Sequence, residues 1–263
     1  MRLGRDAAGV PPDAAPPTPF AGVRVLLLDF DDTLVASSGA DAAALRDTLS
    51  RYRDAFRADN LEELVRHHER ILLDVKRVFH ETGVWAYPPE RLGRLLAERG
   101  GDPALAEEMG AHYLDVRLRN LRPFPGVFDF IERLRGRGYR VGIVTNGPAR
   151  QRQWLDRLGF LPRVDAVAIA GEEDVRKPDP RLFRLALERA GGAAPAEVAV
   201  AGDSFEMDVL PARSLGYRTA YVAGAPGDVR SRIFDNLPPP DPADAVADAV
   251  VARVTDLEPL LPG

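Results

Sequence analysis

Carboxylates gather at one point of the chain, directly after an apolar run near the N-terminus. The stretch 24–35 reads RVLLLDFDDTLV, so an apolar segment ends in Asp29, Asp31 and Asp32. Carboxylates repel one another and are costly to bury, so such a cluster at the end of a core strand calls for a cation. If the extended geometry continues past the strand, Asp29 and Asp31 face one ligand together, because side chains two apart point the same way.

Polar side chains also follow two later apolar runs. VGIVTNG ends in Thr145 and Asn146, and VAVAGDSFEMD supplies Asp203 and Asp208. A loop between these runs, VRKPDP, contributes Lys177. In open α/β sheets, ligands bind outside the carboxyl ends of the strands. We therefore expect these side chains to meet at one edge of a sheet.

The residue types narrow the ligands of that site. Asp29, Asp31 and Asp203 offer hard oxygen ligands, whose negative charge suits Mg²⁺ better than zinc. With Mg²⁺ bound, Lys177, the Thr145 hydroxyl and the amides around Asn146 can hold a phosphoryl group. A nearby carboxylate can attack that group and form an aspartyl-phosphate, while a second carboxylate protonates the leaving oxygen and later activates water. This is the mechanism of a phosphatase.

The elements that must position these residues are read from the apolar pattern. Strands are predicted at 24–28, 140–145, 164–170, 198–201, 217–222 and 250–254, and helices at 128–134, 150–158 and 180–190. Such alternation predicts an α/β fold, a Rossmann-like parallel sheet with helices on both faces. Residues 41–121 carry few strand signals, and their apolar residues recur at helical spacing, which predicts an insert of about four helices.

Composition limits the classes of function. The net charge of −5 favours neither nucleic acid nor an anionic membrane as a partner. The absence of Cys excludes a disulfide framework, a thiolate zinc site and a cysteine nucleophile. No apolar run approaches the roughly 20 residues of a membrane span, and the N-terminus lacks the apolar core of a signal peptide. We expect a cytoplasmic protein whose Pro- and Ala-rich residues 1–20 are a disordered extension.

The motifs together resemble the haloacid dehalogenase superfamily of hydrolases. DFDDT, the strand-terminal Thr145, Lys177 in RKPDP, and GDSFEMD occur in the order seen in that superfamily. The resemblance covers nearly all of residues 23–222. The helical insert looks like the family's C1-type cap, so we expect a core of residues 21–36 and 122–263 and a cap of residues 37–121.

The resemblance implies a role for each motif residue. Asp29 is expected to be the nucleophile and a Mg²⁺ ligand, and Asp31 the general acid/base, with its backbone carbonyl also on the metal. Lys177, together with Thr145, is expected to hold the phosphoryl group. The two aspartates of GDSFEMD have different expected roles. Asp203 is expected to bind Mg²⁺ directly, and Asp208 is expected to act through water or by orienting Lys177.

Other polar residues have ordinary structural interpretations. Asp32 is predicted to be a local partner within its loop, and Ser204 a helix cap. The four histidines all fall in the insert, and His68, on an apolar stripe, is interpreted as a satisfied interior residue. Trp85 and Tyr87 could close over substrate but are first assigned to packing. Arg117 and Arg119 could read an anionic group of the substrate, although solvated helix charges are the more common case.

These observations predict a Mg²⁺-dependent phosphatase acting on a small phosphorylated metabolite. A sugar-phosphate mutase on the same site is the nearest alternative, because an aspartyl-phosphate can return its phosphoryl group to a sugar. A non-catalytic phosphometabolite-binding regulator is the alternative from another class, although a binder needs no nucleophile. A dehalogenase is disfavoured, since the family's dehalogenases need neither Mg²⁺ nor the second Asp, and Asp31 is present. Neither the substrate nor the choice between monomer and homodimer follows from the sequence.

Overall fold

A six-stranded parallel sheet forms the centre of the protein. The computed structural model describes residues 18–56, 60–82, 86–225 and 247–262. The strands are β1 (Val25–Leu28), β2 (Arg140–Thr145), β3 (Ala166–Ile169), β4 (Val198–Gly202), β5 (Arg218–Val222) and β6 (Ala249–Val251). Their order in the sheet is β3-β2-β1-β4-β5-β6, with every neighbouring pair parallel. The α/β sheet predicted from the sequence is thus confirmed, and β1 lies where the strand order reverses.

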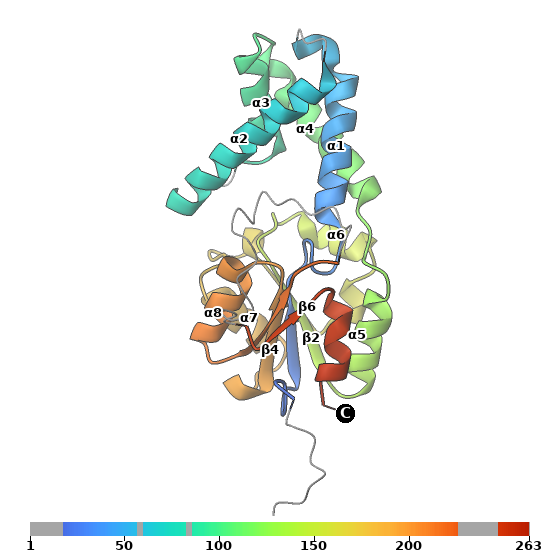
Figure 1. The fold of residues 1–263 in the computed structure, drawn as a ribbon, viewed down its shortest axis with the longest axis vertical. Helices are drawn as coiled ribbons and strands as arrows, with labels where there is room; N and C mark the ends of the chain where they lie inside the picture. The colour runs from blue at the N-terminus through green and yellow to red at the C-terminus, as the bar shows by residue number, and fades with distance from the viewer. Residues whose placement is uncertain (1–17, 57–59, 83–85, 226–246, 263) are drawn as a thin grey trace, which may run out of the picture.

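Helices cover both faces of the sheet, as the doubly apolar strands require. Successive residues of β1 alternate between two hydrophobic clusters: Leu26 and Leu28 pack in one, Val25 and Leu27 in the other. The first cluster takes in α5 (Val127–Gly136), and the second takes in α7 (Arg181–Arg189). Burying each such side chain stabilises the fold by about 1.5–3 kcal/mol. Figure 1 shows the resulting layers, with α5 on one side and α7 with α8 (Leu210–Ser214) on the other.

A helical unit lies beyond the carboxyl ends of the strands (Figure 1). It contains α1 (Ser37–Arg51), α2 (Leu61–Thr82), α3 (Pro88–Glu98) and α4 (Ala106–Asn120), with short 3₁₀ turns at Arg53–Phe56 and Pro103–Leu105. Its hydrophobic core is its own, built from residues such as Leu49, Phe56, Leu64, Leu92 and Met109. These four α-helices, counted among the described residues of the unit, agree with the number predicted for the insert. This unit begins at Ser37, where the chain leaves the loop after β1.

Some elements differ from those predicted. The strand expected at 250–254 ends at Val251, and a 3₁₀ helix (Val254–Leu260) follows, because Val254, Leu257 and Leu261 pack into the sheet's core at helical spacing. Phe20 was assigned to the N-terminal extension, yet it is buried in the same cluster. Residues 1–17 of that extension lie outside the described residues, as does Trp85.

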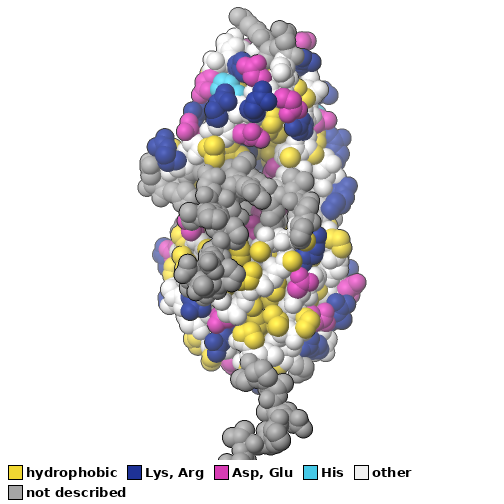
Figure 2. Space-filling view, in the orientation of Figure 1, with side chains coloured by type: hydrophobic (Ala, Val, Ile, Leu, Met, Phe, Trp, Pro, Cys, Tyr) yellow, Lys and Arg dark blue, Asp and Glu magenta, His cyan; other side chains and the backbone are white. Residues whose placement is uncertain are grey.

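The described helices and the surface of the helical unit (Figure 2) are both rich in polar residues. None of the described helices combines the length and apolarity that crossing a bilayer would demand. Figure 2 shows acidic and basic side chains intermixed over the visible face of the helical unit. Charged residues of both signs therefore face solvent on the visible part of this unit.

Candidate active site

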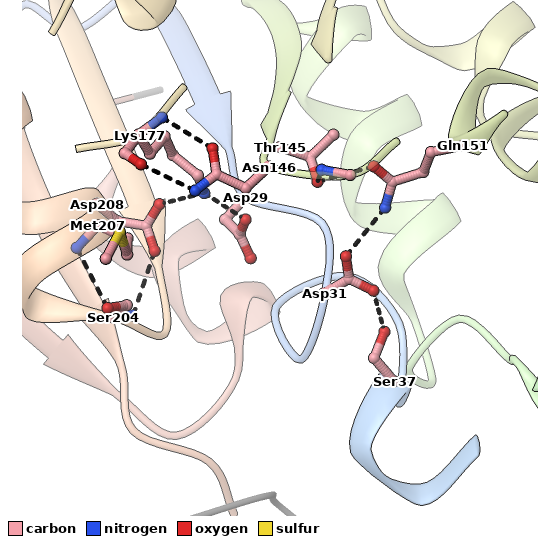
Figure 3. A network of polar contacts seen from close by, with 11 residues as sticks. Asp29, Asp31, Ser37, Thr145, Asn146, Gln151, Lys177, Ser204, Met207 and Asp208 are labelled. Carbon is pink, nitrogen blue, oxygen red and sulfur yellow. Dashed lines mark hydrogen bonds and ion pairs between the residues drawn. The ribbon is translucent and has the colours of Figure 1, made fainter. Parts of the chain in front are cut away.

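Asp29, Lys177 and Asp208 form a buried ion-pair cluster at the carboxyl end of the sheet. Lys177 Nζ lies 2.6 Å from Asp29 Oδ1 and 2.6 Å from Asp208 Oδ1 (Figure 3). Asp29 directly follows β1, Lys177 comes from the loop after β3, and Asp208 lies in a π-helical turn (Phe205–Val209) after β4. All three side chains are buried, with Lys177 only 3% exposed. The fold therefore brings one cation between two carboxylates that are far apart in sequence.

A metal ion fits beside this cluster. One carboxylate oxygen from each of Asp29, Asp203 and Asp208 lies within 4.8 Å of the others. Asp29 Oδ2 is buried and has no hydrogen-bond partner among the described residues. A buried carboxylate oxygen without a donor is unfavourable unless a cation or ligand completes it. These oxygen donors suit a hard divalent cation such as Mg²⁺.

Glycine at position 202 allows this arrangement. A Cβ added to Gly202 would lie 2.3 Å from the Asp208 carboxyl group, which is closer than atoms can approach. Asp208 Oδ2 also accepts a hydrogen bond from the Ser204 amide at 3.2 Å. Ser204 caps the π-helical turn through the Met207 amide at 3.2 Å, as predicted. The turn and the glycine together place the Asp208 carboxylate against Lys177.

Asp31 has different partners from Asp29. Its Oδ1 accepts hydrogen bonds from the Ser37 hydroxyl and, at 2.9 Å, from Arg117 Nη2. Its Oδ2 accepts from Gln151 Nε2 at 2.9 Å (Figure 3). The strand β1 ends at Leu28, so Asp29 and Asp31 lie in the loop that follows it. Both still line one cleft.

Gln151 is a site residue that the sequence reasoning missed. It is fully buried and joins two candidate functional residues, since its Oε1 accepts from the Thr145 hydroxyl at 3.0 Å while its amide holds Asp31. Gly147 makes room for it: a Cβ there would lie 1.5 Å from Gln151 Oε1. A glutamine near the start of a predicted helix carries no local signal for such a role, so only the fold could identify it.

Asn146 is positioned toward the backbone of Lys177. The side-chain Nδ2 of Asn146 donates to the backbone carbonyl of Lys177 at 3.0 Å, and the side-chain Oδ1 of Asn146 accepts from the backbone N–H of Lys177 at 2.8 Å. This two-way contact joins the loop after β2 to the loop that carries Lys177. The phosphate-binding prediction for this segment concerned the backbone amides, of which the Gly147 amide lies 3.3 Å from the Thr145 hydroxyl oxygen.

Two arginines of α4 behave differently. Arg119 is exposed and pairs with Asp115 one turn away, as predicted for a solvated helix charge. Arg117, for which the same interpretation was favoured, is instead 8% exposed and bonded to both Asp31 and Asp41. Both acids precede it by more than 70 residues, so nothing local in the sequence distinguishes the two arginines. The Arg117 bond to Asp31 joins the helical unit to the loop after β1.

Among the other residues with predicted structural roles, the prediction for Asp32 is confirmed and that for His68 is not. Asp32 is a local loop partner, because it accepts from the Ser38 amide at 2.9 Å and from the Ser38 hydroxyl. Its positive φ of 56° is one that aspartate tolerates in a tight turn. Tyr87 lines the cleft, with the Arg150 guanidinium over its ring. His68 is buried, but the expectation that it is satisfied is wrong, since neither ring nitrogen has a partner in the described structure.

Burial controls the electrostatics of the site. It raises the pKa of Asp29 to about 7, although the adjacent Lys177 acts in the opposite direction. Burial also raises the pKa of Asp32 to about 6, against the lowering effect of its bonds to Ser38. For Lys177 burial alone would lower the pKa, but the carboxylates of Asp208 and Asp29 raise it above its usual value. Lys177 therefore stays protonated. The buried Asp29 carboxyl group needs a neighbouring cation, such as Lys177, to favour its ionised form.

A cleft of about 810 Å³ connects these groups to the helical unit. Its wall at the sheet includes Asp29, Asp31, Thr145, Lys177 and Asp203. Its opposite wall is formed by side chains of α1 to α4. The carboxylates, the cation and the hydroxyl predicted from the sequence therefore share one cavity large enough for a small metabolite.

Comparison with known proteins places this arrangement in context. A family model described as haloacid dehalogenase-like hydrolase matches residues 23–216. The chain is 31% identical to a glyceraldehyde 3-phosphate phosphatase of Methanopyrus kandleri, over 82% of this chain and 91% of that protein. It is 33% identical to a phosphoserine phosphatase of Thermus thermophilus, over 76% and 88% respectively. Among solved structures, the HAD hydrolase YfnB of Bacillus subtilis, bound to magnesium, superposes with a TM-score of 0.70 at 23% identity, covering 91% of this chain and 98% of that one.

Proposed function

This chain belongs to the haloacid dehalogenase-like hydrolase family, and we propose that it is a Mg²⁺-dependent phosphatase that hydrolyses small phosphorylated metabolites through an aspartyl-phosphate intermediate. One observation carries the proposal. The buried Asp29 carboxylate has one oxygen held by Lys177 and the other without a partner among the described residues, at an edge shared with Asp203 and Asp208. Relatives named as phosphatases of small metabolites support the same class of substrate.

In the first half of the reaction, an oxygen of Asp29 attacks the phosphorus of the ester, and the P–O bond to the alcohol breaks. Lys177 offsets the charge of Asp29 and of the incoming phosphoryl group at short range in a buried setting. The Thr145 hydroxyl, which now donates to Gln151, turns its proton toward a phosphoryl oxygen. Asp31 donates a proton to the leaving alcohol oxygen.

In the second half, water attacks the phosphorus of the aspartyl-phosphate and releases inorganic phosphate. Asp31 takes the proton from that water and so returns to the form that it needs for the next turnover. Gln151 and Arg117 hold the Asp31 carboxylate where both proton transfers occur. Asp29, Asp203 and the Asp31 carbonyl would hold Mg²⁺, which when bound supplies positive charge to the phosphoryl oxygens. Asp208 acts mainly by fixing Lys177.

We further propose that residues 37–121 act as a C1-type cap over a core of residues 21–36 and 122–263. The hydrophobic cluster of the helical unit is separate from the two clusters of the sheet, which supports a unit able to move as one body. Closure of such a unit would exclude water from the phosphoryl group. The cytoplasm, predicted from the sequence, is the compartment that we propose.

A panel of phosphate monoesters tests the proposed function. We expect phosphate release with Mg²⁺ and none with EDTA, and Asp29→Asn should lose turnover while its circular dichroism is unchanged. Asp29→Asn activity within about tenfold of wild type, a barrier change of roughly 1.4 kcal/mol, would refute the nucleophile assignment. Isomerisation of a sugar phosphate without phosphate release would favour the mutase, and binding without turnover would favour a regulatory protein.

A further inference from the structure

The cleft extends well past the groups that act on the phosphoryl group. Its far wall is formed by the helical unit and includes His68 of α2, Arg91 of α3 and Tyr113 of α4. A substrate whose phosphoryl group lies at Asp29 must place its remaining atoms toward this wall. The polar groups of the wall therefore decide which ester fits.

His68 is the unusual member of this wall. Its side chain is 2% exposed, and neither Nδ1 nor Nε2 has a hydrogen-bond partner in the part of the chain that the structure describes. His67 and His112, by contrast, each contact a carboxylate at 2.6 Å, from Glu98 and Asp47 respectively. A buried imidazole with both nitrogens unpaired is unfavourable unless something completes it. Because His68 lines the cleft, a ligand in the cleft can do so.

The charge near His68 indicates the sign of that ligand. Arg91 is 7% exposed and lines the same wall. Burial lowers the pKa of His68 to about 3, and the positive charge of Arg91 acts in the same direction. A guanidinium has five N–H donors, more than one internal contact can use, and its planar fork matches a carboxylate. A neutral imidazole beside this cation presents one N–H donor to an anion.

The acidic groups of the cleft wall do not cancel this preference. Asp41 already accepts hydrogen bonds from Tyr113 and from Arg117, both at 2.8 Å. Glu69, on the same helix as His68, is exposed to solvent. Next to Asp41, Arg117 keeps its Nη1 buried and without a partner among the described residues. The wall therefore holds buried nitrogens, on His68 and Arg117, that no described residue satisfies.

We propose that His68 and Arg91 form a subsite for a carboxylate at the non-phosphoryl end of the substrate, so that the preferred substrates are phosphate monoesters of small hydroxy or amino acids. This inference rests on the proposed phosphatase function. The two oxygens of a carboxylate can accept together from the imidazole N–H of His68 and from the planar guanidinium of Arg91.

Matched pairs of esters test the subsite. In wild type with Mg²⁺, we expect kcat/KM to be at least tenfold higher for 3-phosphoglycerate than for glycerol 3-phosphate, which differ only in a carboxylate against a hydroxymethyl group. The same preference should hold for O-phosphoserine over O-phosphoethanolamine. Ratios within about threefold of one in both pairs would overturn the proposal, as would a preference for fructose 1,6-bisphosphate over both acids.

Variants connect the preference to these residues. His68→Leu and Arg91→Met should each reduce the carboxylate preference at least tenfold, and Arg91→Lys should retain part of it. His67→Leu is the matched control, because it makes the same substitution at the next position of α2, outside the cleft, and it should keep the wild-type ratio. An unchanged ratio in both His68→Leu and Arg91→Met would refute the assignment.

A binding measurement on wild type decides the matter even where a variant does not fold. The chain has four histidines, so their ring signals can be followed by NMR in histidine-labelled protein. Adding 3-phosphonopropionate should shift the His68 signals, and propylphosphonate, which lacks the carboxylate, should not. Equal effects of the two would refute the subsite. If no ester, p-nitrophenyl phosphate included, releases phosphate, the proposed function itself fails, which is a different result from loss of the preference.

Discussion

Lys177→Met tests whether the buried cluster is held together by its cation. The substitution keeps most of the side chain's volume and removes the charge that lies 2.6 Å from both Asp29 and Asp208. Removing one partner of a buried ion pair typically destabilises a protein by about 3–5 kcal/mol, because a buried charge is left uncompensated. For a chain of this length, that loss corresponds to a fall in Tm of roughly 5–10 °C. We expect this result in EDTA at pH 8.

The pH dependence of the loss has a definite sign. Without the lysine, the pKa of Asp29, already raised to about 7 by burial, should rise further. A carboxyl group whose pKa is raised in the folded state binds protons there more tightly than in the unfolded chain, so its stability penalty shrinks as pH falls below that pKa. The destabilisation of Lys177→Met should therefore be smaller at pH 5 than at pH 8. Denaturant melts in EDTA at both pH values measure it.

Two controls separate this effect from simple loss of an ion pair. Arg152→Met removes an arginine that pairs with Glu172 on the surface and should cost about 1 kcal/mol or less at either pH. Adding Asp208→Asn to Lys177→Met removes one of the two stranded charges and should restore part of the stability. If Lys177→Met costs no more than Arg152→Met at pH 8, the cation does not hold this cluster together and the reasoning is wrong.

Three other changes test neighbouring parts of the site. Asp31→Asn should reduce turnover of alkyl phosphates about 10²–10⁴-fold. It should slow single-turnover phosphorylation of the enzyme less with p-nitrophenyl phosphate than with an alkyl phosphate, because the nitrophenolate leaving group needs less protonation. Equal losses of the phosphorylation rate with the two esters would contradict a general-acid role. Gln151→Leu removes the hydrogen bond to the Asp31 carboxylate, which is worth about 1.5–3 kcal/mol. In steady-state kinetics this variant should lower kcat more than it raises KM. An effect on KM alone would argue against a role of Gln151 in positioning Asp31. Burial lowers the pKa of His68 to about 3, so below about pH 6.5 the unfolded chain binds a proton at this residue while the native protein does not. Between pH 7 and pH 5, the free energy of unfolding of wild type should therefore fall by about 2 kcal/mol relative to that of His68→Leu. Denaturant melts in which the two proteins lose the same stability over this range would contradict a buried neutral imidazole.

The sequence by itself determined the sheet and the ends of the strands where chemistry gathers. Runs such as VLLL and VAVAG are buried on both faces, so their apolar character alone indicated parallel strands with helices on either side. Because polar residues directly follow these strands, Asp29, Thr145 and Asp203 could be assigned to one edge without coordinates. The four helices of the insert were equally legible, since an amphipathic helix repeats its apolar residues at a fixed spacing.

Only the tertiary structure decided which polar side chains meet. Lys177 stands 148 positions from Asp29 and Arg117 stands 86 from Asp31, and no local pattern encodes contacts at such separations. Gln151 and His68 have ordinary neighbours in sequence, yet one is buried between two candidate functional groups and the other faces the cleft with no partner among the described residues. Periodicity reports which side of an element is apolar, because burial follows a repeat. A hydrogen bond between distant residues depends on where two elements cross, and that is set by the packing of the whole molecule.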